Sequence, residues 1–322
     1  MRIFPRFKDL PADARGTVAA IGNFDGVHLG HQAVIAMARR RAEALGRPLS
    51  VITFEPHPRS FFQPDLPPFR LTPQAAKARQ LQALGIDCLF TLPFDAAMAA
   101  LSAEEFLARV LADGLGIRHA IVGYNFAFGH GRRGNVETLT SLAKENGFGV
   151  DPVSAVESTD RRVYSSSLIR MMLGRGEPHQ AAALLGREWE VEGQVQGGKR
   201  LGNTIGFPTA NLALGEYLRP ALGVYAVRCG LEEGGTTRWY GGAANYGKRP
   251  TVDGQGELLE AHLFDFTGDL YGRNLRVAFV ERLRAEKKFD GLDALKAQIA
   301  EDCRAARVLL AERPREAATD RA

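Results

Sequence analysis

The stretch AIGNFDGVHLGHQAVI, residues 20–35, joins the end of an apolar run to the start of a helical pattern. Two glycines, Gly22 and Gly26, lie in this junction, and two histidines, His28 and His31, follow one helical turn apart. A strand that passes through a tight turn into a helix is typical of a parallel α/β sheet. The free N–H groups and the dipole of such a helix favour phosphate binding at the turn.

The same alternation of strand and helix patterns continues to about residue 185. The predicted strands are residues 17–24, 49–56, 86–94 and 119–126, and the predicted helices are residues 31–46, 73–85, 102–116 and 136–147. Ser102 with Glu105 has the pattern of a capping box, and Asn135 is a predicted N-cap. We therefore predict an α/β domain with a Rossmann-like parallel sheet that helices cover on both faces.

After residue 186 the pattern changes. Strand-like segments, separated by glycines and turns without an intervening helix, cover residues 189–197, 223–230, 238–246, 258–266 and 275–283. This pattern predicts a small antiparallel β-barrel, followed by a C-terminal helix over Leu292–Glu312. The 322 residues are thus expected to form two domains, 1–186 and 187–322.

Composition argues against several classes of protein. The net charge is only +4, from 41 Lys and Arg against 37 Asp and Glu residues, so charge does not indicate nucleic-acid binding. The three cysteines form no C-x-x-C motif, which argues against a disulfide framework or a zinc site and fits a reducing compartment. Without a signal-peptide pattern or a long apolar segment, we expect a cytoplasmic protein that makes no membrane contact.

The histidine pair has three possible interpretations when it is taken by itself. Its imidazoles could donate hydrogen bonds to phosphate as charge develops in a transition state. They could be two solvated histidines in a plain strand–turn–helix, or a metal pair that needs a third ligand. The longer run GNFDGVHLGH resembles the signature of the nucleotidylyltransferase superfamily. That resemblance implies catalytic roles for both histidines and an ATP site made of Gly22, Phe24, Asp25, Gly26, His28 and His31.

Three further segments resemble the flavin adenylyltransferases of this superfamily. They are YSSSLIRMML (164–173), VGYNFAFGHGRRGN (122–135) and FEPHP (54–58). The resemblance implies phosphate or nucleotide contacts from Asn125, Ser165, Ser166 and Arg170, flavin contacts from Pro56, Pro58 and Tyr124, and a pocket shaped by Phe126 and Phe128. An arginine suits phosphate because its guanidinium binds two oxygens at once. Without the resemblance, the hydroxyls cap a helix and the prolines shape a turn. Ser167 stands where the family has threonine.

The second half resembles the riboflavin kinases. The resemblance rests on GNTIGFPTANL (202–212), YGGAANYGKRPTV (240–252) and residues 258–299. Thr209 and Asn211 offer the hard oxygen ligands that suit Mg²⁺, and the resemblance assigns both to an Mg–ATP site. Glu260 matches the catalytic base of the family, although the strand pattern alone makes it a carboxylate on a polar face. The other kinase-site residues implied are Gly202, Gly206, Pro208, Asn245 and Arg249. Asn203 stands where the family frequently has arginine, so a phosphate contact from an arginine is not assumed there.

Both halves together resemble the bacterial bifunctional riboflavin kinase/FAD synthetase family, with motifs in family order over roughly residues 15–310. This implies that the barrel makes FMN and ADP from riboflavin and ATP. The α/β domain would then join FMN to AMP from ATP, giving FAD and pyrophosphate, and both reactions would need Mg²⁺. Two alternatives stay open: one domain only binds or tethers flavin, or the barrel binds nucleic acid. The barrel has no basic, aromatic-lined strand face that would favour the latter. The oligomeric state is not predicted.

Overall fold

The computed structural model describes residues 1–156, 163–197, 207–249 and 256–315. Contacts between residues divide the chain into two compact units, Met1–Pro67 with Lys77–Ser165 and Pro68–Ala76 with Ser166–Ala322. This division falls before the predicted boundary at residue 186, because two helices that follow Ser165 pack with the second unit. As a boundary between activities, residue 186 stays a prediction.

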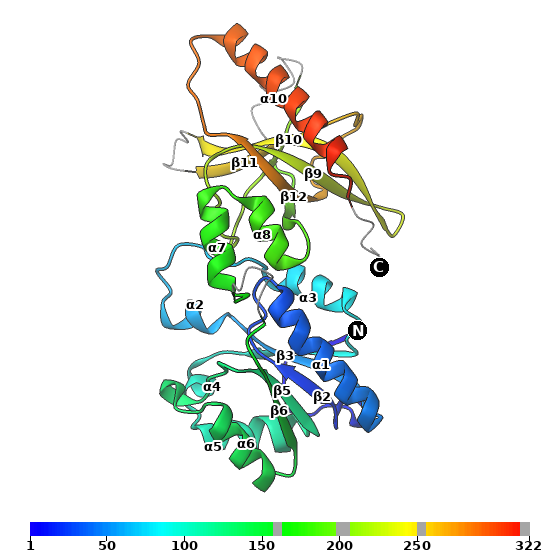
Figure 1. The fold of residues 1–322 in the computed structure, drawn as a ribbon, viewed down its shortest axis with the longest axis vertical. Coiled ribbons are helices and arrows are strands. Elements are labelled where there is room, and N and C mark those ends of the chain that lie inside the picture. The colour runs from blue at the N-terminus through cyan, green and yellow to red at the C-terminus, as the bar shows by residue number, and fades with distance from the viewer. Residues whose placement is uncertain (157–162, 198–206, 250–255, 316–322) are drawn as a thin grey trace. The chain divides into compact units, whose positions relative to one another are not determined.

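The first unit contains the predicted parallel sheet, with six strands in the order β1-β4-β3-β2-β5-β6. Figure 1 labels β2, β3, β5 and β6 of this sheet. The strands are β1 (Arg2–Phe4), β2 (Val18–Ile21), β3 (Leu49–Glu55), β4 (Cys88–Pro93), β5 (His119–Gly123) and β6 (Gly149–Val153). The edge strands β1 and β6 were not predicted, because β1 has three residues and a proline interrupts β6. After β2, the chain places β3 and then β4 on one side of β2. It then crosses over to place β5 and β6 on the other side, so the strand order reverses its direction beside β2.

Helices cover both faces of this sheet, as predicted. Helices α1 (Leu29–Leu45) and α3 (Gln74–Ala83) supply side chains to the core on one face. On the other face, the core includes side chains of α5 (Ala103–Glu105), the π-helical segment η2 (Phe106–Leu115) and α6 (Val136–Glu145). Successive strand residues point to opposite faces, so the fully buried β2 contributes to both cores. The shorter helical segments are η1 (Ala12–Ala14), α2 (Pro58–Phe62), α4 (Ala96–Ala100) and η3 (His130–Arg132).

The ends of several helices follow from local side-chain chemistry. Gly46 ends α1 in the left-handed conformation, with φ 59° and ψ 41°. The capping box between Ser102 and Glu105 is present, with hydrogen bonds in both directions. The side-chain oxygen of Asn135 accepts a hydrogen bond of 2.8 Å from the backbone N–H of Thr138 at the start of α6. These three predicted helix ends are confirmed.

The second unit contains the predicted antiparallel sheet, curled and ordered β7-β12-β9-β10-β11-β8. Its strands are β7 (Trp189–Gln194), β8 (Ala210–Leu212), β9 (Gly223–Glu233), β10 (Thr236–Arg249), β11 (Gly256–Leu263) and β12 (Asn274–Arg284). Just after β7, Gln196 forms an antiparallel bridge with Asn211 of β8, and its N–H donates to the Asn211 carbonyl at 2.9 Å. This bridge joins the two edges of the sheet and closes it toward a barrel.

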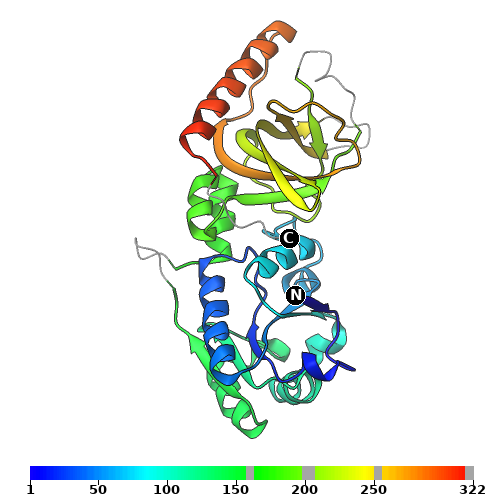
Figure 2. The ribbon, with the colours of Figure 1, turned by 90° about the vertical axis from the view of Figure 1, so that its right-hand side faces the viewer.

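In the part of the chain that the structure describes, three helices accompany the barrel sheet. Helix α10 (Leu292–Glu312) has the predicted bounds and lies along the sheet (Figure 2), where Ala306 and Leu310 join an apolar cluster with strand side chains. Two parallel hydrogen bonds, of 2.9 and 2.7 Å, join Arg284 of β12 to Asp302 of α10. Helix α7 (Ser166–Arg175) packs on α8 (Pro178–Leu185), which contacts β7 and β12. Among the described residues, no helix combines the length and apolar character needed to cross a lipid bilayer.

We predict that α8 is part of the folding unit of the barrel. Its Leu184 and Leu185 are buried, and burial of one leucine side chain contributes about 1.5–3 kcal/mol. A fragment of residues 187–322 should therefore unfold at lower urea concentration than a fragment of residues 166–322, with a loss of at least about 2 kcal/mol. Both tryptophans, Trp189 and Trp239, lie in this unit, so tryptophan fluorescence measures its unfolding. Equal midpoints would show that the barrel folds without α7 and α8.

Candidate active sites

The predicted residues of the first unit gather at the carboxyl ends of three neighbouring strands. The turn of residues 22–28 follows β2, Pro56 follows β3, and Tyr124 and Asn125 follow β5. Because β2 pairs in parallel with both β3 and β5, these three exits lie at one edge of the sheet. In open parallel sheets, ligands bind at this edge, beside the point where the connections reverse.

The two histidines of the turn lie against each other. Nδ1 of His28 accepts a hydrogen bond of 3.3 Å from the backbone N–H of His31, so His28 is the N-cap of α1. When Nδ1 accepts, the proton of the neutral ring is on Nε2, which makes Nε2 a donor. The two rings stack with centroids 3.6 Å apart, and Phe24 meets His31 edge-on at 5.2 Å. The structure therefore brings this predicted pair together at the start of a helix.

The backbone of the turn is bent in a way that most residues avoid. Phe24, Gly26 and Val27 have left-handed φ values of 49°, 88° and 42°. Glycine accepts this conformation easily, whereas it costs the other two of the order of 1–3 kcal/mol each. The side chains of Phe24 and Val27 are almost fully buried, and so is Asp25, so core packing holds the turn in shape. Such strain is often found at ligand-binding turns.

The loop after β5 combines exposed and buried residues. Tyr124, 51% exposed, and Asn125 face solvent. Phe126 and Phe128 stack with centroids 5.4 Å apart. Phe128 is buried and also packs on Phe106, 5.8 Å away, so it supports the loop from the core. Phe128 is thus mainly a core residue, whereas Phe126 is only partly buried. Both rings stay predictions as residues that shape the pocket.

Sequence analysis missed an aromatic cluster at the same edge. Phe61 and Phe62 of α2 and Phe94 after β4 meet edge-on, with centroids 5.2, 5.5 and 5.7 Å apart, and Phe62 is 63% exposed. Pro58 is the first residue of α2, and His57 accepts a backbone hydrogen bond as its N-cap, so both build the helix that presents these rings. Exposed rings of this kind can hold a planar aromatic ligand. The signal in the sequence was the FF pair within a polar segment.

The remaining predicted phosphate residues lie around the start of α7. Ser165 ends the first unit, whereas Ser166 and Arg170 are on α7 in the second. Nε of Arg170 donates a hydrogen bond of 2.9 Å to the carbonyl of Phe69, and its guanidinium lies 5.3 Å from the Phe69 ring. These contacts orient the guanidinium within the second unit. Roles of the three residues toward ATP stay predictions.

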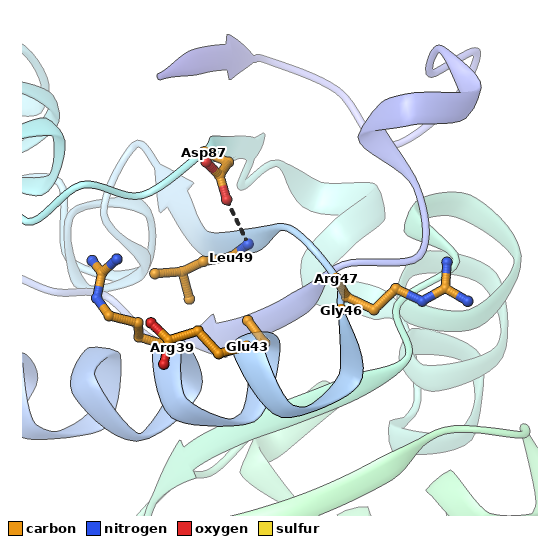
Figure 3. A pocket seen from close by; sticks show the side chains of 7 residues that line it. Arg39, Glu43, Gly46, Arg47, Leu49 and Asp87 are labelled. Carbon is orange, nitrogen blue, oxygen red and sulfur yellow. Dashed lines mark hydrogen bonds between the residues drawn. The ribbon is translucent and has the colours of Figure 1, made fainter.

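A hollow of about 160 Å³ lies at the opposite edge of the parallel sheet (Figure 3). It is lined by Arg39, Ala42, Glu43, Gly46, Arg47, Leu49 and Asp87. Leu49 begins β3, and its N–H donates a hydrogen bond of 2.8 Å to Asp87, just before β4. The hollow is therefore at the amino ends of the strands. It is also smaller than the roughly 300–1,000 Å³ of ordinary ligand pockets, so it forms no part of the candidate site.

The predicted kinase residues meet on the sheet of the second unit. Glu260 of β11 lies directly opposite Asn245 of β10 and Asn211 of β8 in the antiparallel register. Residues opposite each other on neighbouring strands point to the same face, with Cβ atoms about 4.5–5.5 Å apart. Thr209 precedes Asn211 by two residues and lies just before β8 begins. Three predicted residues from three strands thus share one face, and Thr209 is close to them in the chain.

Asn211 has the features of a ligand-binding residue. It is 6% exposed, and its Oδ1 has no hydrogen-bond partner among the described residues. Such a buried orphan acceptor costs about 1–3 kcal/mol unless a ligand satisfies it. In the described part of the chain, no cluster of three or more His, Cys, Asp and Glu side chains could hold a metal. A hard cation such as Mg²⁺ prefers oxygen ligands, and the side-chain oxygens of Asn211 and Thr209 are ligands of this kind.

Two contacts on neighbouring positions hold the strands around Glu260 in register. Nδ1 of His262 lies 2.8 Å from the carbonyl oxygen of Pro208, which ties the segment before β8 to β11. The hydroxyl of Tyr246 on β10 donates a hydrogen bond of 2.5 Å to Glu257 of β11. Burial, with a smaller effect of this hydrogen bond, raises the pKa of Tyr246, which therefore stays protonated and able to donate. Sequence analysis did not single out these supporting residues.

Four positions of the predicted kinase site remain to be placed. Gly202 and Gly206, and the variant position Asn203, lie outside the described residues. Arg249 is described by its backbone alone, which pairs with Gly256 at the end of β10.

Comparisons with known proteins find matches to both halves of the chain. A model of the FAD synthetase family matches residues 10–167, and a model of the riboflavin kinase family matches residues 185–310. A bifunctional riboflavin kinase/FMN adenylyltransferase of Pseudomonas fluorescens is 43% identical over 97% of this chain and 98% of its own length. The protein of the same name from Escherichia coli (strain K12) is 40% identical over 90% and 92%. A crystal structure from Streptococcus pneumoniae, described as a macrolide-efflux protein, matches with a TM-score of 0.83 at 30% identity, covering 95% and 98%.

Proposed function

The chain belongs to the family of bifunctional riboflavin kinases/FMN adenylyltransferases, and from this membership we propose how its residues carry two reactions. The enzyme phosphorylates riboflavin with ATP to give FMN, and it transfers AMP from ATP to FMN to give FAD. The observation that carries this conclusion is the match to bifunctional relatives over nearly the whole chain. The matched ranges include the turn with His28 and the strand with Glu260. It disfavours the alternatives of a single retained activity or a nucleic-acid-binding barrel.

For the kinase reaction, Glu260 is the proposed base. It takes the proton of the ribityl hydroxyl while that oxygen bonds to the γ-phosphorus, and the bond to the bridging oxygen breaks to release ADP. Thr209 and Asn211 would hold Mg²⁺, which when bound offsets the charge of the phosphates. Asn245, opposite Glu260, is positioned to orient the carboxylate or the ribityl chain. The other proposed residues of this nucleotide site are Gly202, Gly206, Pro208 and Arg249.

For the adenylyl transfer, His28 and His31 donate hydrogen bonds to the α-phosphate. An oxygen of the FMN phosphate bonds to the α-phosphorus, and the bond to the β-phosphate breaks, so pyrophosphate leaves. The backbone N–H groups at the start of α1 add to the positive field there. The phosphates are further bound by Ser165, Ser166 and Arg170, the nucleotide by Asn125, and the flavin by Pro56, Pro58, Tyr124 and the exposed ring of Phe62.

We also propose a cytoplasmic location, because both reactions consume ATP and the three cysteines are free thiols. The proposed partners are the small molecules riboflavin, FMN, FAD, ATP, ADP and pyrophosphate. Residues 1–186 would carry the adenylyl transfer and residues 187–322 the phosphorylation.

One incubation tests the function as a whole. Purified protein with riboflavin and Mg–ATP should produce FMN first and FAD later, separated by chromatography. Excess chelator should stop both steps, because both need Mg²⁺. A protein that stops at FMN, or that converts supplied FMN to FAD but leaves riboflavin unchanged, has only one of the activities.

His28→Ala should slow FAD formation by about a hundred- to a thousandfold, the usual effect of removing one donor that stabilises a transition state. FMN formation should remain nearly normal because it uses the other unit. His28→Asn is the matched control for stability, since asparagine is also a strong N-cap and keeps an acceptor for α1. It should be as inactive as His28→Ala yet more stable to heat. If both reactions slow equally in a folded variant, the assignment of His28 to one site is wrong.

Glu260→Gln should slow FMN formation by about two to four orders of magnitude, because glutamine keeps the size of the side chain but is not a base. Riboflavin affinity, measured by quenching of flavin fluorescence, should change little, since the loss falls on the transition state. FAD formation from supplied FMN should persist. Glu257→Gln on the same strand is the control and should affect stability more than turnover. Near-normal FMN formation by folded Glu260→Gln would reassign this residue to hydrogen bonding of the ribityl chain.

A further inference from the structure

A fully buried lysine contacts the backbone of the histidine turn. Lys77 of α3 is 1% exposed, and its Nζ lies 3.2 Å from the carbonyl oxygen of Asn23 and 3.1 Å from Oγ1 of Thr53. The carboxylate of Glu55 is 3.7 Å away and balances the charge. Burying an ammonium is costly unless it is paired and hydrogen-bonded, and here both conditions are met. The contacts connect α3 and β3 to the turn that follows β2.

The carbonyl of Asn23 receives two donors. The Thr53 hydroxyl also donates to it, at 3.1 Å. This carbonyl belongs to the peptide that leads into Phe24, the first left-handed residue of the turn, whose ring contacts His31. Because these bonds fix the peptide plane between Asn23 and Phe24, they orient the backbone of the strained turn that follows.

We propose that Lys77 is a positioning residue for the adenylyl transfer. Its ammonium and the Thr53 hydroxyl together fix the Asn23 carbonyl, and the turn then places His31 and His28 at the distance that the α-phosphate requires. The inference rests on the proposed function of the two histidines and adds a residue that acts through the backbone. A displacement of about 1 Å at a catalytic group can cost about a hundredfold in rate, so a buried anchor below the turn has a large effect.

The test compares AMP transfer to FMN by Lys77→Met, Thr53→Val and the double variant, all assayed well below their melting temperatures. Methionine is an unbranched side chain of similar length that tolerates burial. It lacks the charge and the hydrogen-bond donors of lysine. We expect kcat to fall about a hundredfold in Lys77→Met, while KM for ATP and FMN changes by less than about threefold. Lys77→Arg should recover part of the loss. Lys144→Met, at an exposed position of α6, should leave both reactions unchanged.

Thr53→Val should lower kcat about tenfold. Because both side chains serve one carbonyl oxygen, the double variant should lose much less than the product of the two single losses. Riboflavin phosphorylation in the same preparations should stay within about twofold of normal, because it uses the other unit. Thermal unfolding followed by far-ultraviolet circular dichroism shows whether the first unit is folded in each variant. If Lys77→Met does not fold, Lys77→Arg and Thr53→Val provide the same test.

Three results would overturn the inference. A folded Lys77→Met with normal kcat would make the lysine purely structural. A raised KM for ATP at unchanged kcat would mean that its charge binds phosphate directly. Losses that multiply in the double variant would mean that the two side chains do not act on one carbonyl. Failure of the unmodified protein to make FAD is a separate result, and it would remove the proposed function itself.

Discussion

The parallel pairing of β2 with β3 on one side and β5 on the other is the constraint on which the first unit depends. It buries β2 on both faces, so its four residues must all be apolar, and it brings three strand exits to one edge of the sheet. At this edge the chain turns into α1, whose first N–H groups require acceptors. His28 satisfies one of them with Nδ1 and thereby has its other ring nitrogen as a donor. One imidazole thus caps the helix and also offers a donor at the proposed site.

In the second unit, the arrangement of the proposed site depends on the register of neighbouring strands. Asn211, Glu260 and Asn245 share a face only because β8, β11 and β10 are aligned as they are. A slip of one residue would move Glu260 to the opposite face. The contacts of His262 with Pro208 and of Tyr246 with Glu257 lie beside these residues and resist such a slip. Side chains beside the proposed site therefore help to keep Asn211, Glu260 and Asn245 on one face.

The two proposed sites offer different groups to phosphate. The first would combine backbone N–H groups with imidazole donors, and the second would combine neutral oxygen ligands with one carboxylate. The residues that match the FAD synthetase family extend to residue 167, whereas packing assigns the chain from Ser166 to the second unit. Helix α7, with Ser166 and Arg170, therefore folds with the barrel although these residues are proposed to serve adenylyl transfer. The boundary between the packed units lies before α7, whereas the proposed boundary between the two activities lies after α8.

The sequence by itself determined the features that arise from residues close together in the chain. Alternating strand and helix patterns, the caps at Gly46, Ser102 and Asn135, and the run GNFDGVHLGH all depend on spacings of a few residues. Only the tertiary structure decided that Lys77 contacts Asn23, that the rings of α2 meet Phe94, and that Glu260 lies between two asparagines. A buried lysine on a helix has no local signature, because its partners are 22 to 54 residues away. Such contacts form when the sheet fixes its strand order, and this order depends on packing of the whole unit.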